Sequence, residues 1–157
     1  MSASTERGRA RSAGSLLASS RRLLAATTVV AAVATVGSLY FSQVLGLVPC
    51  ELCWYQRILM YPLVVVLGVA AAEVRPGVWR TALPLSLAGV AVAAYHTYVQ
   101  VVPSAGGSCS IGGGCSAVLY PMLGGALTIP RLSLVAFVLI SAGLATLARA
   151  RTAAPER

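Results

Sequence analysis

Residues 23–48 read LLAATTVVAAVATVGSLYFSQVLGLV and contain no charged side chain. A bilayer core about 30 Å thick is crossed by a helix of roughly 20 apolar residues. The apolar positions in this segment form no stripe opposite a charged face, which is typical of a helix that is buried on all sides. The sequence therefore predicts a membrane-spanning helix over Leu23–Val48.

Three further segments have the same length and character. They are Trp54–Ala72, Thr81–Val102 and Leu132–Ala148, the last of which could begin near Leu127. We therefore expect an all-α integral membrane protein, a bundle of four transmembrane helices within residues 23–148. Residues 1–22 are rich in Ser, Ala and Arg and are expected to form a disordered tail, and residues 149–157 a second tail.

The overall composition leads to the same fold class. Of the 157 residues, 57% are hydrophobic and only 10% are charged, whereas soluble domains carry about 25% charged residues. A soluble fold of this size could not bury so much apolar surface. The net charge of +8 could indicate nucleic acid as a partner, but the arginines lie at the edges of apolar runs. We expect contact with membrane lipid and no nucleic-acid partner.

The arginines also predict the orientation in the membrane. If both tails are cytoplasmic, ten of the twelve arginines lie inside, and only Arg57 and Arg131 lie outside. Cytoplasmic loops are enriched in Lys and Arg, so the sequence predicts that both termini are cytoplasmic. The four cysteines then fall on the extracytoplasmic side, where disulfides persist.

The first span has one competing interpretation. Arg21-Arg22 and the later Ala32-Val33-Ala34 resemble a signal peptide with a small-residue cleavage site. The apolar run continues to Leu47, which is too long for a typical signal core, so we favour a retained span.

A C-x-x-C motif, Cys50-Glu51-Leu52-Cys53, lies between the first two spans. This spacing can cycle between dithiol and disulfide. If the second helix begins near Cys53, its N-terminus and Arg57 one turn on both favour a thiolate at Cys53. The alternatives are a permanent disulfide and half of a zinc site. The zinc alternative is the weakest, because His96 is the only histidine and no carboxylate lies near the second cysteine pair; we expect no metal ligands.

The second pair, Cys109 and Cys115, lies in the charge-free loop between Pro103 and Pro130. The residues between the two cysteines include three consecutive glycines, which allow a disulfide to close and reopen. A permanent disulfide is the alternative. Because a C-x-x-C motif is expected on the same membrane face, a relay by thiol–disulfide exchange is favoured.

Arg57 and His96 lie inside the expected spans, near the outer face. Arg57 is the only charge in the second span, and an ionisable residue there marks a functional site unless it snorkels to the interface. His96 lies about two turns below the outer face, and its alternative role is packing. The similar depths of Arg57 and His96 suggest that both flank one shallow pocket, with nearby aromatic residues forming a belt or the wall of a site for a flat ring.

These segments resemble a known family. Val48–Arg57, with its C-x-x-C motif, aromatic pair and arginine, resembles the active-site segment of the DsbB disulfide-bond formation proteins, and Tyr95–Gln100 resembles the third-helix segment of that family. Met60–Leu63 and Leu127–Pro130 look most like its shorter BdbC-type branch. The resemblance covers about residues 23 to 148.

The resemblance implies an enzyme of the bacterial cell membrane, a thiol:quinone oxidoreductase that supports disulfide bond formation. Its partner would be an extracytoplasmic thioredoxin-fold protein like DsbA or BdbD, and its cofactor would be menaquinone or ubiquinone. Alternatives are a membrane thiol/disulfide reductase, a quinone-epoxide reductase of the related fold, or a Cys-based metal-binding membrane protein.

The resemblance also implies roles on the thiol side of the site. Cys109 exchanges with the partner, and Cys115 then exchanges with Cys50. The tight spacing of the second pair departs from the best-known members and leaves the order of exchange between Cys109 and Cys115 open.

On the quinone side, the resemblance makes Cys53 the thiolate that faces the cofactor. Arg57 stabilises that thiolate and the negative charge that develops on the quinone. His96 lines the ring site.

Overall fold

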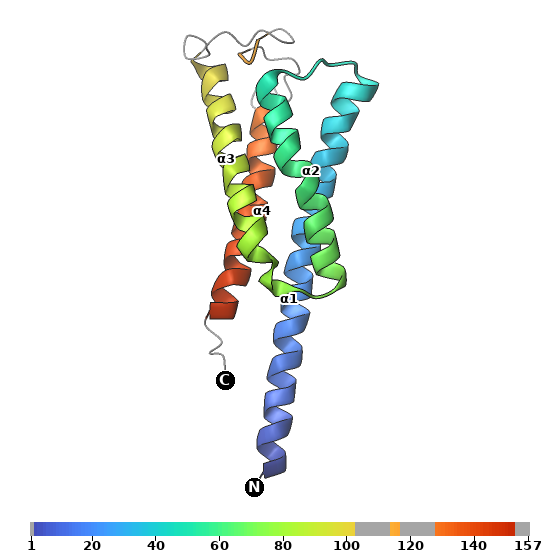
Figure 1. Cartoon of the computed structure of the whole chain (residues 1–157), viewed down its shortest axis with the longest axis vertical. Coiled ribbons are helices and arrows are strands. Elements are labelled where there is room, and N and C mark those ends of the chain that lie inside the picture. The colour runs from blue at the N-terminus through green and yellow to red at the C-terminus, as the bar shows by residue number, and fades with distance from the viewer. Residues whose placement is uncertain (1, 103–113, 117–127, 153–157) are drawn as a thin grey trace.

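The computed structural model describes residues 2–102, 114–116 and 128–152, and within them it contains helices and no strand. Figure 1 shows four long helices side by side. The helices are α1 (Ser2–Leu39), α2 (Glu51–Ala72), α3 (Trp79–Val101) and α4 (Ile129–Thr152), with a π-helical turn at Tyr40–Val44 and a short 3₁₀ turn at Pro76–Val78.

The prediction of four spans is confirmed. The segments that are long and apolar enough to cross a membrane are Leu17–Val44, Glu51–Ala72, Pro76–Val101 and Ile129–Thr152. The backbone of α1 is helical from Ser2, so most of the residues assigned to the first tail continue the helix. Ala, Arg and Glu in this region are good helix formers.

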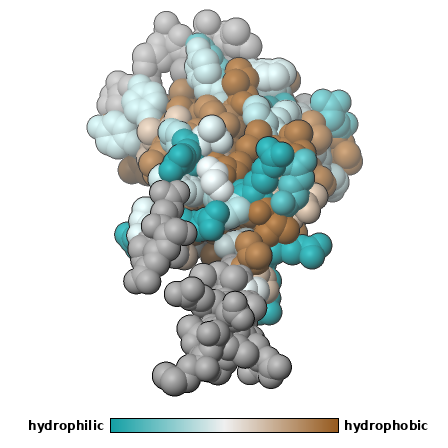
Figure 2. All heavy atoms as spheres, turned by 60° about the horizontal axis from the view of Figure 1, so that its bottom comes forward, coloured by the Kyte–Doolittle hydropathy of each residue, from teal (hydrophilic) through white to brown (hydrophobic). Residues whose placement is uncertain are grey.

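The helices form an antiparallel ring. Helix α1 packs against α2 and α4, and α3 packs against the same two helices. Figure 1 shows that α1 begins and α4 ends at the same end of the bundle, while α2 begins and α3 ends at the other. Figure 2, which brings the first end forward, shows polar side chains gathered there and apolar ones on the flanks. Cys50 lies at the end opposite the termini.

Aliphatic and aromatic side chains of α2 and α4 fill the centre of the bundle. Leu63, Leu67, Phe137 and Ile140 are completely buried. A Cβ atom added at Gly89 would overlap the Phe137 ring, so glycine lets α3 approach α4 closely, as small residues do in membrane helix interfaces.

Polar contacts also join α3 to α4. The buried Ser141 hydroxyl donates to the Ser86 Oγ atom at 2.9 Å, and Thr128 donates to Gln100 at 2.9 Å next to the cysteine end. Hydrogen bonds of this kind hold membrane helices together because lipid offers no competing partner. They fix the position of α3, which carries His96.

Candidate active site

Cys50 is the residue that caps the N-terminus of α2. It has extended backbone angles (φ −71°, ψ 172°), and its carbonyl oxygen accepts the N–H of Trp54 at 3.1 Å. Pro49 precedes it and disfavours a helical conformation at the position before itself. Cys50 therefore lies at the positive end of the helix dipole.

The two sulfurs of the C-x-x-C motif lie against one another. Cys50 and Cys53 carry free thiols, and their Sγ atoms are joined by a hydrogen bond of 2.9 Å. Cys50 is 3% exposed, and Cys53 is partly exposed.

The hydrogen bond from the Cys53 thiol lowers the pKa of Cys50 to about 4, and the hydrogen bond from His96 adds to the effect against the opposing effect of burial. The sequence predicts a thiolate at Cys53 on the expectation that the second helix begins near that residue. In the structure α2 begins at Glu51, and Cys50 is its cap.

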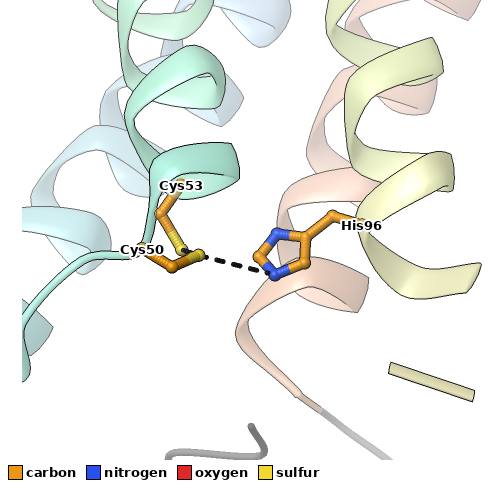
Figure 3. A group of neighbouring side chains, drawn as sticks. All are labelled: Cys50, Cys53 and His96. Atoms are coloured by element: carbon orange, nitrogen blue, oxygen red, sulfur yellow. Dashed lines mark hydrogen bonds between the residues drawn. The ribbon is translucent and has the colours of Figure 1, made fainter. Parts of the chain in front are cut away.

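His96 on α3 faces this pair, as Figure 3 shows. It is 2% exposed. Its Nε2 atom lies 3.7 Å from Cys50 Sγ and 3.2 Å from the carbonyl oxygen of Cys115. Its Nδ1 atom lies 3.0 Å from Nε2 of Gln56, which is also buried. With the Gln56 amide donating to Nδ1, the imidazole proton lies on the nitrogen that faces Cys50 and Cys115.

One cysteine of the second pair reaches the same place. Cys115 is disulfide-bonded and buried, and it packs with Cys50 and Val99 in one small apolar cluster. Cys109 lies outside the described residues. The structure therefore brings the C-x-x-C motif and Cys115 together, as the relay requires.

Arg57 points toward α1. Its Nε atom donates to the Ser38 hydroxyl at 3.0 Å, and its Nη2 atom donates to the Ser38 carbonyl oxygen at 2.9 Å. The guanidinium carbon also lies 5.5 Å from the centroid of the Trp54 ring. Ser38 lies two residues before the π-helical turn at Tyr40–Val44, and π-helical turns are frequent at functional sites.

A cavity of about 470 Å³ opens next to Cys53. Its walls come from α1, α2 and α4, and its polar lining includes Cys53, Gln56 and Arg57. Tyr61, one turn beyond Arg57, also lines it, and the Tyr61 hydroxyl is buried without a hydrogen-bond partner among the described residues. The other lining residues are mainly apolar: Val29, Val30, Val33, Ala34, Phe41, Leu47, Val48, Met60, Ile129, Leu132, Val135, Ala136 and Leu139.

The predicted residues divide into two groups. Cys53 and Arg57 line the cavity, whereas His96 does not and instead contacts Cys50 and Gln56. Sequence reasoning missed the contact of Arg57 with Ser38, for which the sequence carries no signal. It assigned Tyr61 to the group of interfacial aromatics, although the i, i+4 spacing places Tyr61 on the same helix face as Arg57.

The same cluster contains three side chains of the kinds that bind metals. The ligand atoms of Cys50, Cys53 and His96 all lie within 4.8 Å of one another. The sequence predicts no metal ligands, because His96 is the only histidine and no carboxylate lies near the second cysteine pair.

Comparisons with known proteins agree with this arrangement. The family described as disulfide bond formation protein DsbB matches residues 20–147. The chain is 46% identical over 119 residues to disulfide bond formation protein C of Bacillus subtilis, covering 74% of this chain and 86% of that protein.

Two proteins described as probable disulfide formation proteins are also similar. The Oceanobacillus iheyensis protein is 44% identical over 121 residues (75% of this chain, 83% of that protein). The Deinococcus radiodurans protein is 42% identical over 137 residues (82% and 89%). No solved structure matches the chain.

Proposed function

Because the chain belongs to the DsbB family of disulfide bond formation proteins, we propose that it is a thiol:quinone oxidoreductase. In this proposal it reoxidises an extracytoplasmic thioredoxin-fold thiol oxidase of the DsbA or BdbD kind and passes the electrons to membrane quinone. One observation carries the proposal: Cys50 is buried in one apolar cluster with Cys115, whereas Cys53, which packs against that cluster, also lines an apolar cavity.

The thiol side of the reaction begins at the second pair. Since Cys50 and Cys53 are free thiols, the partner of Cys115 in its disulfide is proposed to be Cys109, the remaining cysteine of the chain. A thiolate of the reduced partner protein attacks Cys109 and releases Cys115 as a thiolate. The second partner thiol then attacks the mixed disulfide, which leaves the partner oxidised and the Cys109–Cys115 pair reduced.

The next exchange takes place inside the bundle. The Cys115 thiolate attacks Cys50 of the Cys50–Cys53 disulfide, and Cys53 leaves as a thiolate. Cys109 then attacks Cys115, which re-forms the second disulfide and leaves Cys50 and Cys53 reduced. The described sulfurs correspond to this last state, with Cys115 in a disulfide and both thiols of the motif free.

The cavity fits a quinone by three features. It is mainly apolar, it is lined by the cation of Arg57 as well as by Cys53, and it contains the Tyr61 hydroxyl, which has no hydrogen-bond partner in the part of the chain that the structure describes. A quinone held there would supply the oxidising capacity for two electrons and two protons that Cys50 and Cys53 need to return to the disulfide. Arg57, held by Ser38, would supply a fixed positive charge beside the quinone, and Tyr61 would donate a hydrogen bond to it. The apolar walls exclude water, which strengthens both interactions.

The membrane orientation is part of the proposal. Arg75 and Arg80 lie near the ends of α2 and α3 that point toward the termini, and Arg149 and Arg151 lie in the last turn of α4. This distribution supports a cytoplasmic location for that end. The cysteine end then faces the extracytoplasmic side of the cell membrane.

The test is quinone reduction by the purified protein in detergent, driven by a reduced DsbA-type partner. We expect turnover by the wild type and loss of turnover in both Cys50→Ser and Cys109→Ser. The matched control is Tyr55→Phe, which changes an exposed side chain on the same turn of α2. If the wild type reduces neither menaquinone nor ubiquinone analogues, the proposed function is wrong.

A further inference from the structure

The imidazole of His96 has no task in the electron transfer described above, yet it lies with Cys50 and Cys53 in one cluster whose ligand atoms are within 4.8 Å of one another. We propose that the reduced C-x-x-C pair and His96 bind one zinc ion, and that the bound zinc holds the pair in its dithiol state. The site rests on the geometry alone. Its consequence, the arrest of electron transfer, rests on the proposed function.

The distances fit the coordination chemistry of zinc. With Zn–S bonds of about 2.3 Å and Zn–N bonds of about 2.0 Å, a tetrahedral ion separates its sulfur and nitrogen ligands by about 3.5 Å. The distance from Cys50 Sγ to His96 Nε2 is 3.7 Å. Two zinc-bound sulfurs lie about 3.8 Å apart, whereas the two Sγ atoms are 2.9 Å apart. Only a small side-chain rotation is therefore needed, and partly exposed Cys53 can make it.

The surroundings complete the site. The Cys115 carbonyl oxygen lies 3.2 Å from His96 Nε2, close to the separation of about 3.4 Å expected for two light-atom ligands of one zinc ion. This oxygen, or a water molecule bonded to it, can occupy the fourth position. Metal-bound histidines donate their other N–H to a neighbouring acceptor. Gln56 stands 3.0 Å from Nδ1 and presents its Oε1 atom when its amide is turned over.

Charge balance favours zinc over the bare dithiolate. Two thiolates, a neutral imidazole and Zn²⁺ give a neutral complex, whereas two unpaired negative charges at this buried position are costly. Binding forms two Zn–S bonds and displaces the thiol proton that the reduced pair still carries, and nothing is oxidised or reduced. A disulfide offers no thiolate, so the oxidised pair cannot bind zinc in this way.

The experiment measures zinc directly. The purified full-length protein is either reduced with dithiothreitol or oxidised with diamide, desalted without air, and titrated with Zn²⁺ against a chelator of known affinity. We expect one zinc per reduced chain and none in the oxidised protein. Because dithiothreitol also reduces the second pair, the double variant Cys109→Ser, Cys115→Ser is titrated in parallel, and it should keep its zinc.

Substitutions identify the ligands. His96→Gln and Cys53→Ser should weaken zinc binding by at least about 100-fold, and Gln56→Leu should weaken it by about 10- to 100-fold through the imidazole. Tyr55→Phe, whose exposed hydroxyl donates to Glu51 on the outside of the helix, should bind zinc like the wild type. Co²⁺ bound to the reduced wild type should show sulfur-to-metal charge-transfer absorption that is absent in Cys53→Ser.

Three results would overturn the zinc site: no binding by the reduced wild type, equal binding by reduced and oxidised protein, or wild-type affinity in His96→Gln. The first two need no substitution, so they decide the question even if a variant fails to fold. Partner-driven quinone reduction with a chelator present tests the proposed function separately. Normal turnover without zinc binding by the reduced protein rejects only the zinc site.

Discussion

The two thiols of the C-x-x-C motif are three residues apart in sequence but lie in different surroundings. Cys50 is buried among hydrogen-bonding groups, with His96 and the Cys115 carbonyl oxygen beside it. Cys53 lines an apolar cavity whose cation is Arg57. The difference teaches that one turn of helix is enough to give each thiol of a pair its own surroundings. In the proposed function, the Cys50 side exchanges with another cysteine and the Cys53 side serves the cofactor.

The largest effect is expected from Cys53→Ser, which removes the thiol on the cavity side alone. Steady-state quinone reduction should fall by more than about a thousandfold, since the reacting sulfur is gone. The second pair should still oxidise about one equivalent of reduced partner in a single turnover, because Cys109 and Cys115 remain. A stopped-flow assay of partner oxidation measures both values. Continued multiple turnover would show that the two sides are not distinct.

The low pKa of Cys50 predicts how its rate of alkylation depends on pH. Because its pKa is lowered to about 4, the thiolate is present above that pH and is lost only as the pH falls through about 4. Alkylation of Cys50 by iodoacetamide should therefore change little between pH 5 and 8, where the rate of an ordinary thiol with a pKa near 8.5 changes by about tenfold per pH unit.

This rate is measured by peptide mass spectrometry on reduced protein in buffer with a chelator, which keeps zinc away from the sulfurs. A tenfold slope per pH unit at Cys50 across this range would contradict the hydrogen-bonded arrangement around it.

Arg57→Ala tests the cavity side. Loss of a charged hydrogen-bond donor should raise the quinone KM by about tenfold to a hundredfold, while circular dichroism shows an unchanged helix content. Arg80→Ala is the control, since that side chain stacks on Trp79 at the opposite end of the bundle. Equal KM values in the two variants would remove Arg57 from the site.

Tyr61→Phe should give the smallest effect. It should not lower the stability of the free protein, but it should lower the affinity for quinone. The hydroxyl is buried without a partner among the described residues, so its removal should leave the free protein equally stable or stabilise it by up to about 1 kcal/mol. Quinone affinity should fall by about three- to tenfold, because one neutral hydrogen bond is lost. Thermal unfolding and quinone titration measure the two effects, and unchanged affinity would place the quinone away from Tyr61.

The sequence was sufficient to predict the four-helix bundle, because high hydropathy over 18 or more residues is a strong signal of a membrane-spanning helix. All four predicted spans lie within or closely match the helices found, and the three described cysteines pack together. The pairing of the C-x-x-C motif with Arg57 on one helix could also be predicted, because both lie on consecutive turns.

The relative rotation of the helices could not be predicted. A helix that is apolar on all sides gives no sign of which face meets which neighbour. The sequence predicts similar depths for His96 and Arg57 and hence one shared pocket, but the structure turns His96 toward Cys50 and Gln56. The Ser38–Arg57 contact depends on where α1 ends in a π-helical turn, which no residue pattern in the sequence indicates.

The central claim is that Cys50, and not Cys53, is the thiol that exchanges with the second pair. The direct measurement identifies the internal disulfides before any reduced partner is added, with alkylation of free thiols, non-reducing digestion and mass spectrometry. In Cys53→Ser, a Cys50–Cys115 disulfide should be found, because the Cys50 thiolate attacks Cys115 of the second disulfide and Cys109 leaves as a thiol. In Cys50→Ser, no Cys53–Cys115 disulfide should form. Accumulation of a Cys53–Cys115 disulfide in Cys50→Ser would contradict the account.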